Sequence, residues 1–174
     1  MTLRQILTEP NKILREKSQP VEKVDSDLQK LMDDMLETMY AAPGIGLAAI
    51  QIGIPKRVIV MDLSKKDEPK KPMYFVNPEV IRKSDNNSTY EEGCLSVPGQ
   101  FAEIDRPDKC HIKYLDYHGK PKEIKADGML ATCIQHEMDH LEGILFIDYL
   151  SKLKKSMIIK KLSKQKKAIE RIVV

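Results

Sequence analysis

The sequence predicts a single α+β domain, with small antiparallel or mixed sheets around a central helix and a further helix at the C-terminus. Three observations lead to this fold class. The 174 residues suit one domain with a sizeable core. Segments rich in Val and Ile alternate with polar residues in the middle of the chain, which is typical of strands. Apolar residues recur at helical spacing near both ends and between the strand segments.

Four helices are expected, and each follows a residue that favours a helix start. These residues are Pro10, Asp25 or Ser26, Asp127 and Ser151. The expected ranges are 11–15, 26 to about 40, 128–141 and 152 to about 171. Gly143 ends the third helix, which is the central one.

Strands are expected over 57–63, 73–76, 79–82, 110–117 and 120–126. The dipeptide Asn77-Pro78 is expected to break the second of these strands from the third. The dipeptide His118-Gly119 is a turn signal, so the last two strands should form a hairpin. The polar, Lys-rich segment 64–72 is expected to be a loop.

Cysteine usage and the apolar segments favour a reducing compartment. The three cysteines are an odd number, and the N-terminus has no long apolar run, so neither a disulfide framework nor a signal peptide is indicated. Residues 38–55 carry no charge, but repeated Gly and Pro residues interrupt them, which argues against a membrane span. We expect a cytoplasmic protein without membrane contact, and an organelle is also compatible with the sequence.

The pattern His136-Glu137-Met138-Asp139-His140 lies inside the expected central helix. The four-residue spacing places both imidazoles on one face, one turn apart, so that they can bind one metal ion. Glu137 is rotated by about 100° from His136 and can reach a water molecule at the metal without being a ligand. This arrangement is the one needed for metal-activated hydrolysis. Two surface histidines on an amphipathic helix are the simpler interpretation, but chance rarely produces the whole pattern.

A catalytic site of this kind needs a third protein ligand. Extended metalloproteases place a third His where this chain has Phe146. Of the later carboxylates, Glu142 is too close along the same helix, and Glu170 lies in the basic tail. An upstream ligand is therefore expected, and the candidates are Cys94, Cys110, Cys133, His111 and His118.

Cys94 is favoured among these candidates. Gly93 permits unusual backbone angles beside it, and Pro98 removes a ladder donor, so this segment can bend the thiolate and adjacent N–H groups towards one point. Cys133 lies too far along the helix axis for one ion to bind it easily together with both histidines. Residues 110, 111 and 118 lie in or beside a regular strand.

Three segments together resemble the peptide deformylase family. They are Gly44-Ile45-Gly46-Leu47-Ala48-Ala49-Ile50-Gln51, Glu92-Gly93-Cys94-Leu95-Ser96, and Gln135-His136-Glu137-Met138-Asp139-His140-Leu141 with Gly143. Their order and separation match the motifs of that family, and the similarity extends over nearly the whole chain. The resemblance implies removal of the N-formyl group from the N-terminal formylmethionine of nascent polypeptides, with release of formate.

The resemblance also implies roles for individual residues. The implied metal ligands are Cys94, His136 and His140. The implied metal is one divalent ion, Fe(II) in the cell, and Zn(II), Ni(II) or Co(II) also suit these ligands. Glu137 is the implied catalytic carboxylate, and the Gln51 side chain and the Leu95 N–H are the implied oxyanion donors. The implied methionine pocket consists of Ile45, Tyr90, Met129, Thr132, Cys133 and His136, and Gly46 would pair with the substrate backbone.

Two positions depart from the family pattern. Phe101 follows Gln100 where many bacterial members have Arg, and Thr132 stands where Ile is common. Both positions concern substrate side chains rather than the chemistry. Arg106 is a candidate ion-pair partner for Glu92 beside the metal, with an ordinary surface Arg as the equal alternative.

Three other functions remain open at this point. A metallopeptidase would digest casein without releasing formate. A structural zinc module would need a fourth ligand from Cys133 or His111 and no open coordination position. A catalytically inactive binding homologue is the third, although every catalytic position is filled.

The basic charge is concentrated at the C-terminus. Residues 151–174 carry nine basic side chains and one acidic, whereas residues 1–150 carry 20 basic and 25 acidic ones. We expect residues 1–150 to form the metallohydrolase domain of a monomer, with residues 151–174 as a basic helix of the same domain. The apolar residues near helical spacing are Leu153, Met157, Ile158, Leu162 and Ile169, and we expect this face to pack on the domain or on a partner. The cations predict weak, salt-sensitive contact with the ribosome, and a solvated Lys-rich face is the alternative.

Overall fold

The computed structural model describes the backbone of residues 1–173 and the side chains of residues 1–168. The helices are α1 (Ser26–Ala41), α2 (Gly128–Leu141) and α3 (Lys152–Val173), with the 3-10 helices η1 (Lys12–Arg15), η2 (Ala49–Ile52) and η3 (Phe146–Tyr149). The strands are β1 (Gly46–Ala48), β2 (Val58–Met61), β3 (Met73–Lys83), β4 (Asn87–Cys94), β5 (Val97–Pro107), β6 (Lys109–Leu115) and β7 (Pro121–Asp127). The predicted α+β fold class is confirmed.

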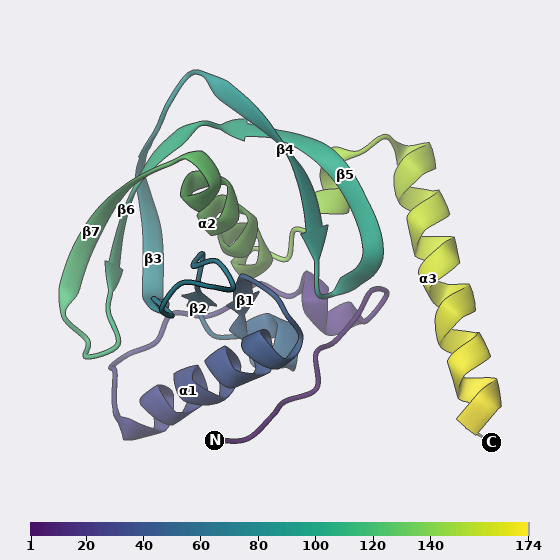
Figure 1. Ribbon diagram of the computed structural model, residues 1–174, viewed down its shortest axis with the longest axis horizontal. Helices are drawn as coiled ribbons and strands as arrows, with labels where there is room; N and C mark the ends of the chain where they lie inside the picture. The colour runs from purple at the N-terminus through teal and green to yellow at the C-terminus, as the bar shows by residue number, and fades with distance from the viewer. Residues whose placement is uncertain (174) are drawn as a thin grey trace.

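The strands form two sheets, and α2 lies between them (Figure 1). The larger sheet has five strands in the order β1-β2-β3-β6-β7, and the smaller one consists of β4 and β5. Every strand pairing in both sheets is antiparallel. The predicted hairpin at His118-Gly119 joins β6 to β7. The central helix of the prediction is therefore α2, which has protein on both sides.

Two apolar clusters hold the helices to the larger sheet. Ile134 of α2 belongs to a fully buried cluster that also contains Phe75 and Ile112. On the other side, methionines of α1 such as Met32 and Met35 pack against β1 and β2. Each such buried side chain contributes roughly 1.5–3 kcal/mol relative to exposure, so these two clusters fix α2 and β1 relative to each other.

Several strands differ from the prediction. β1, β4 and β5 carry no clear sequence signal, and the structure adds all three. The predicted strands 73–76 and 79–82 are wrong as separate elements, because they form one strand, β3, with a register shift. Asn77 adopts a φ of 50° at the shift, and its side-chain amide bonds the backbone of Val21 in both directions over 2.8 Å. This tertiary contact holds the chain in the strand through a dipeptide that usually breaks one.

The helix ends follow the predicted caps with one exception. Asp25 accepts a hydrogen bond from Leu28 N over 2.9 Å, and Ser151 accepts one from Lys154 N over 3.3 Å. Asp127 precedes α2 as predicted, but within the described part of the chain its side chain forms no capping hydrogen bond.

α3 projects along the edge of β5, at the margin of the molecule (Figure 1). Ile158 and Leu162 pack into an apolar cluster that contains Val97. Leu153 and Met157, from the same predicted face, are 72% and 62% exposed and do not pack on the domain. The side chain of Ile169, expected on the same face, lies outside the described residues. No helix within residues 1–173 has the length and apolar character needed to cross a membrane.

Candidate metal centre

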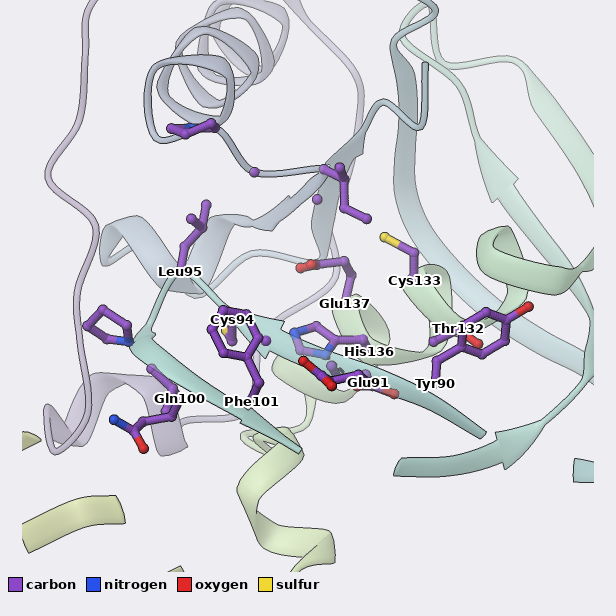
Figure 2. A pocket seen from close by; sticks show the side chains of 18 of the residues that line it. Tyr90, Glu91, Cys94, Leu95, Gln100, Phe101, Thr132, Cys133, His136 and Glu137 are labelled. Carbon is purple, nitrogen blue, oxygen red and sulfur yellow. Dashed lines mark hydrogen bonds and ion pairs between the residues drawn. The ribbon is translucent and has the colours of Figure 1, made fainter. Parts of the chain in front are cut away.

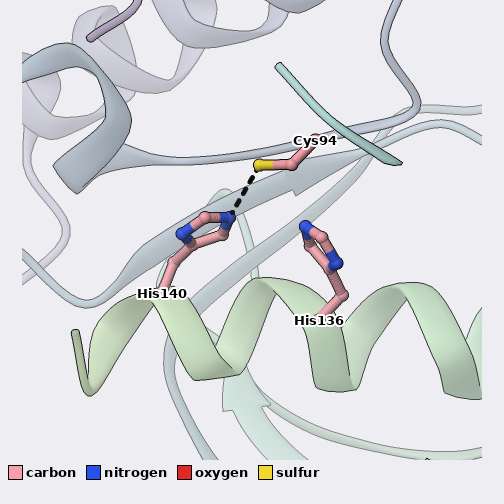
Figure 3. A group of neighbouring side chains, drawn as sticks. All are labelled: Cys94, His136 and His140. Atoms are coloured by element: carbon pink, nitrogen blue, oxygen red, sulfur yellow. Dashed lines mark hydrogen bonds between the residues drawn. The ribbon is translucent and has the colours of Figure 1, made fainter. Parts of the chain in front are cut away.

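α2 presents His136 and His140 to the end of β4 from one helical face (Figure 3). β4 ends at Cys94, whose Sγ lies 3.3 Å from His140 Nε2. The candidate ligand atoms of these three residues all lie within 4.8 Å of one another. One thiolate and two imidazoles are a ligand set that several divalent transition metals accept. The residues present therefore fit a metal ion at this position.

The turn between β4 and β5 places Cys94 beside the helix. Gly93 pairs with Phe101, whereas the next residue, Cys94, pairs with Val97, so residues 98–100 bulge out of β5. Leu95 and Ser96 close the turn. The predicted bend around Gly93 and Pro98 is thus a wide bulge opposite the end of β4, and it turns the thiol towards α2.

Gln51 reaches the same place from η2 and is 1% exposed. Its Oε1 accepts a hydrogen bond from Ala48 N over 2.9 Å, and its Nε2 donates to Ser96 Oγ over 3.0 Å. The same Nε2 lies 3.5 Å from Cys94 Sγ. Because both ends of the amide are held, its second N–H stays directed at the thiol. The role of Ser96 in orienting Gln51 had no separate sequence signal.

Glu137 lies one residue beyond the first histidine and is 4% exposed. Burial raises the pKa of its carboxyl group to about 7. Its Oε2 atom is buried and has no hydrogen-bond partner among the described residues. A Cβ atom added to Gly46 would come within 2.7 Å of the other carboxylate oxygen, so β1 passes directly over this side chain. The carboxylate is therefore held in place by packing, with one oxygen left for a small ligand such as water.

A chain of charged and polar groups supports His136 from behind. His136 Nδ1 lies 2.8 Å from Glu92 Oε1, and Glu92 forms a two-pronged ion pair with Arg106 over 2.7 and 3.0 Å. Arg106 also binds Asp139 over 2.8 Å, and Asp139 accepts a hydrogen bond from Tyr149 over 2.7 Å. The predicted pair of Arg106 and Glu92 is present, and it is buried. Asp139 and Tyr149 were not anticipated, although Asp139 lies within the histidine motif itself.

A cavity of about 480 Å³ opens beside these groups (Figure 2). Its walls include every residue predicted for the methionine pocket: Ile45, Tyr90, Met129, Thr132, Cys133 and His136. Gly46, Gln51, Cys94, Leu95 and Glu137 also line it. His140 is fully buried next to Cys94 and is not part of the wall. All predicted site residues are thus gathered in or directly beside one cavity.

The other candidates for a third ligand lie elsewhere. Cys110 is buried in the core, where burial raises the pKa of its thiol to about 11. His111 pairs with Glu123 over 2.8 Å, and His118 is exposed in the turn before β7. Cys133 lines the cavity but lies outside the potential metal-binding group. Among the described residues this group has three members, so the fourth ligand of a structural zinc module is missing from it.

Replacing Arg106 by Leu is expected to weaken metal binding about 10- to 100-fold, because Glu92 would no longer be held against His136. The change should also lower the free energy of unfolding by about 3–5 kcal/mol, since a buried carboxylate loses its cation. Competition with a chelator measures the first effect, and urea unfolding measures the second. Lys113→Leu breaks an exposed pair with Glu79 and should leave both quantities nearly unchanged. Unaltered metal affinity in the Arg106 variant would contradict this account.

Comparison with known sequences places the chain in one family. The profile described as polypeptide deformylase matches residues 3–156. The chain is 69% identical over 174 residues to the peptide deformylase of Pelagibacter ubique (strain HTCC1062), covering 100% of both chains. It is 63% identical over 171 residues to the peptide deformylase of Maricaulis maris (strain MCS10), covering 98% of both.

Solved structures give the same result. A crystal structure of peptide deformylase from Ehrlichia chaffeensis matches with a TM-score of 0.92 and 43% identity, covering 96% of this chain and 98% of that one. A crystal structure from the same organism in complex with actinonin matches with a TM-score of 0.91 and 46% identity, covering 95% and 98%. The resemblance noted in the sequence is confirmed, and the chain belongs to the polypeptide deformylase family of enzymes.

Proposed function

We propose that the chain hydrolyses the N-formyl group of N-terminal formylmethionine on nascent polypeptides and releases formate. The observation that carries the proposal is the convergence of Cys94, His136 and His140 beside a cavity whose wall includes Glu137. A centre of this kind can hydrolyse an amide, and the cavity next to it has room for an unbranched side chain. Membership of the deformylase family supports the choice of substrate.

Cys94, His136 and His140 would hold the metal ion. When bound, a divalent ion would polarise the formyl carbonyl and make a water molecule more acidic. We infer Fe(II) in the cell, and Zn(II), Ni(II) or Co(II) would also suit this mixed sulfur and nitrogen set. Glu92 would fix the ring orientation of His136 through its Nδ1 atom, since the two lie 2.8 Å apart.

Glu137 would act as the base and then as the acid. Its carboxylate accepts a proton from the attacking water molecule, and the water oxygen forms a bond to the formyl carbon. The carboxyl group then gives that proton to the amine nitrogen as the carbon–nitrogen bond breaks. A pKa of about 7, raised by burial, suits a group that must both accept and release a proton near neutral pH.

Gln51 and Leu95 would stabilise the negative charge that develops on the formyl oxygen. The Gln51 amide nitrogen lies 3.5 Å from Cys94 Sγ, and Leu95 directly follows Cys94 in the chain, so both N–H groups would donate to that oxygen. Ser96 and Ala48 hold the Gln51 amide, so no reorganisation is needed. A formyl carbon carries only a hydrogen atom, so a narrow site can admit it and refuse the methyl group of an acetyl substrate.

The methionine side chain would occupy the cavity along α2. Thr132 and Cys133 are buried and would form its floor, whereas Ile45 and Met129 are 47% and 44% exposed and would flank its mouth. Gly46 would pair with the substrate backbone, and its lack of a side chain leaves room for Glu137, because an added Cβ atom would come within 2.7 Å of Glu137 Oε1. Together with Tyr90, these residues offer the flexible apolar surface that a thioether prefers.

The decisive experiment measures formate release from formyl-Met peptides by anaerobically prepared protein whose metal content is determined in parallel. Rapid formate release with one metal ion per chain is expected, with little hydrolysis of the matching acetyl-Met peptide. Digestion of casein without formate release would instead indicate a metallopeptidase. Metal analysis of protein purified without added metal would test the inference of Fe(II).

The basic helix α3 is proposed to contact the ribosome weakly, which would place a cytoplasmic, monomeric enzyme near emerging chains. Lys160, Lys161 and Lys164 are exposed, whereas Leu162 between them is 4% exposed and packs beside β5. These contacts support a single domain in which α3 packs on the rest of the chain. Removing α3 would therefore uncover apolar surface, so charge reversal is a cleaner test than truncation.

Changing Lys160, Lys161 and Lys164 together to Glu is expected to reduce ribosome co-sedimentation at low salt about tenfold or more, since several phosphate contacts are lost. Turnover of a short formyl-Met peptide should stay within about twofold, because α3 does not line the cavity. Reversal of the exposed residues Lys65, Lys66 and Lys71, in the loop between β2 and β3, is the matched control. Equal co-sedimentation of wild type and the α3 variant would show that the lysines of α3 form a solvated face and do not contact the ribosome.

A further inference from the structure

The mouth of the cavity carries a large exposed apolar side chain that the proposed mechanism does not use. Phe101 is 66% exposed, yet it lines the cavity. Its ring lies against the backbone of Gly93, because a Cβ atom added there would come within 2.5 Å of Phe101 Cε1. Figure 2 shows the ring at the β4–β5 ribbon, in front of Cys94 in this view. Most of the ring surface is therefore available to a ligand that enters the cavity.

Two carboxylates share this face of the β4–β5 ribbon. The register pairs Glu91 with Glu103 and Gly93 with Phe101. These four residues lie on the face of the ribbon opposite to Glu92, which faces inward. Like charges directly opposite each other destabilise a strand pair. Among the ion pairs of the described residues, none includes Glu91 or Glu103. Glu91 also lines the cavity, so its unpaired charge faces the same opening as the ring.

The substrate chain has to pass this face. A formyl group at Cys94 and Glu137 places the methionine in the cavity, and the following residues leave through the mouth. An extended chain advances about 3.3–3.6 Å per residue. Phe101 packs on Gly93, which directly precedes Cys94. The ring would therefore lie no more than one or two substrate residues away from the formyl group.

We propose that Phe101, with Glu91 and Glu103 beside it, ranks formyl-Met peptides by the residues that follow the methionine. Basic side chains are favoured over acidic ones, because a cation is attracted both by an aromatic ring and by the carboxylates. An acidic side chain is repelled by the carboxylates of Glu91 and Glu103 and gains only an apolar contact with Phe101. This proposal rests on the proposed deformylation and adds a substrate preference to it.

The test compares kcat/KM for formyl-Met-Lys-Ser and formyl-Met-Glu-Ser amides at low ionic strength. Wild type should favour the Lys peptide by roughly 3- to 10-fold, and salt should narrow the ratio. Phe101→Arg should abolish or invert this preference, and Glu91→Gln should reduce it. Ile81→Arg introduces the same charge at an exposed apolar position of β3 outside the cavity and should keep the wild-type ratio.

Formyl-Met-Ala-Ser amide separates the proposed deformylation from the proposed preference, because the small Ala side chain makes little contact with the Phe101 ring. Ile81→Arg should turn it over within about twofold of wild type. In Phe101→Arg and Glu91→Gln, a change common to all three peptides cancels in the Lys-to-Glu ratio, and thermal melting checks that every variant is folded. An unchanged Lys-to-Glu ratio in Phe101→Arg overturns the proposed preference. Should no peptide release formate, the proposed deformylation fails, and calorimetric binding of the Lys and Glu peptides then decides the preference, with equal affinities overturning it.

Discussion

Replacing Glu137 by Gln is expected to lower kcat/KM for a formyl-Met peptide by about 10²- to 10⁴-fold while the protein keeps its metal. Gln cannot accept the proton of the attacking water or deliver it to the leaving amine. The ligand atoms of Cys94, His136 and His140 converge without Glu137, so the metal should remain. The fold should also remain, because Gln has the same shape as the buried Glu and carries no charge that burial penalises.

Steady-state kinetics and metal analysis of the same preparation test this expectation. Loss of the metal would make Glu137 a ligand, and near-normal turnover would remove its role as base. Gly46→Ala offers an independent route, because its Cβ would meet the Glu137 carboxylate at 2.7 Å. That variant should lose activity with little loss of stability, since the end of a side chain can move aside. Gly99→Ala would not serve as the control: the space around Gly99 is open, but its φ of +73° would strain the backbone of an alanine.

The metal-binding half of the site was predictable because its information is local. His136, Glu137 and His140 lie on one helix, so helical geometry alone places both rings on one face. The remaining ligand belongs to another element, and spacing could not bring Cys94 to that helix. It was favoured because Gly93 and Pro98 indicate an unusual backbone, and the family motif supported it. The bulge opposite the end of β4 explains why both arguments lead to this residue.

β4 and β5 were missed because their inward face carries charges. Glu92 and Arg106 occupy core-facing positions where an apolar residue would reveal a half-buried strand. They are compatible with burial only because they pair with each other across the ribbon, 2.7 Å apart. The same charges orient His136, so the feature that hides the strands in the sequence belongs to the site. In β3, the apparent break at Asn77 is bridged by Val21, a contact with a residue 56 positions away.

Replacing Cys94 by Ala is expected to weaken metal binding by more than roughly 100-fold and to abolish activity. Loss of a residue that only orients a ligand costs up to roughly 100-fold, and loss of the ligand itself should cost more. The thiolate is one of the three proposed protein ligands. Without it only His136 and His140 remain, because the potential metal-binding group among the described residues has no further member. Metal titration against a chelator measures the loss, and circular dichroism shows whether the fold survives. Retention of a tightly bound ion would contradict the assignment.

The other two cysteines provide matched controls for that variant. Cys110→Ala should keep the metal and lower stability by roughly 1 kcal/mol, because Cys110 is a small core residue on β6. Cys133→Ala should also keep the metal but raise KM for formyl-Met peptides, since Cys133 lines the cavity. Burial raises the pKa of both thiols, so neither readily forms the thiolate that a metal requires. If Cys110→Ala alone removed the metal, the third ligand would be on β6, and the convergence of Cys94 with His140 at 3.3 Å would need another explanation.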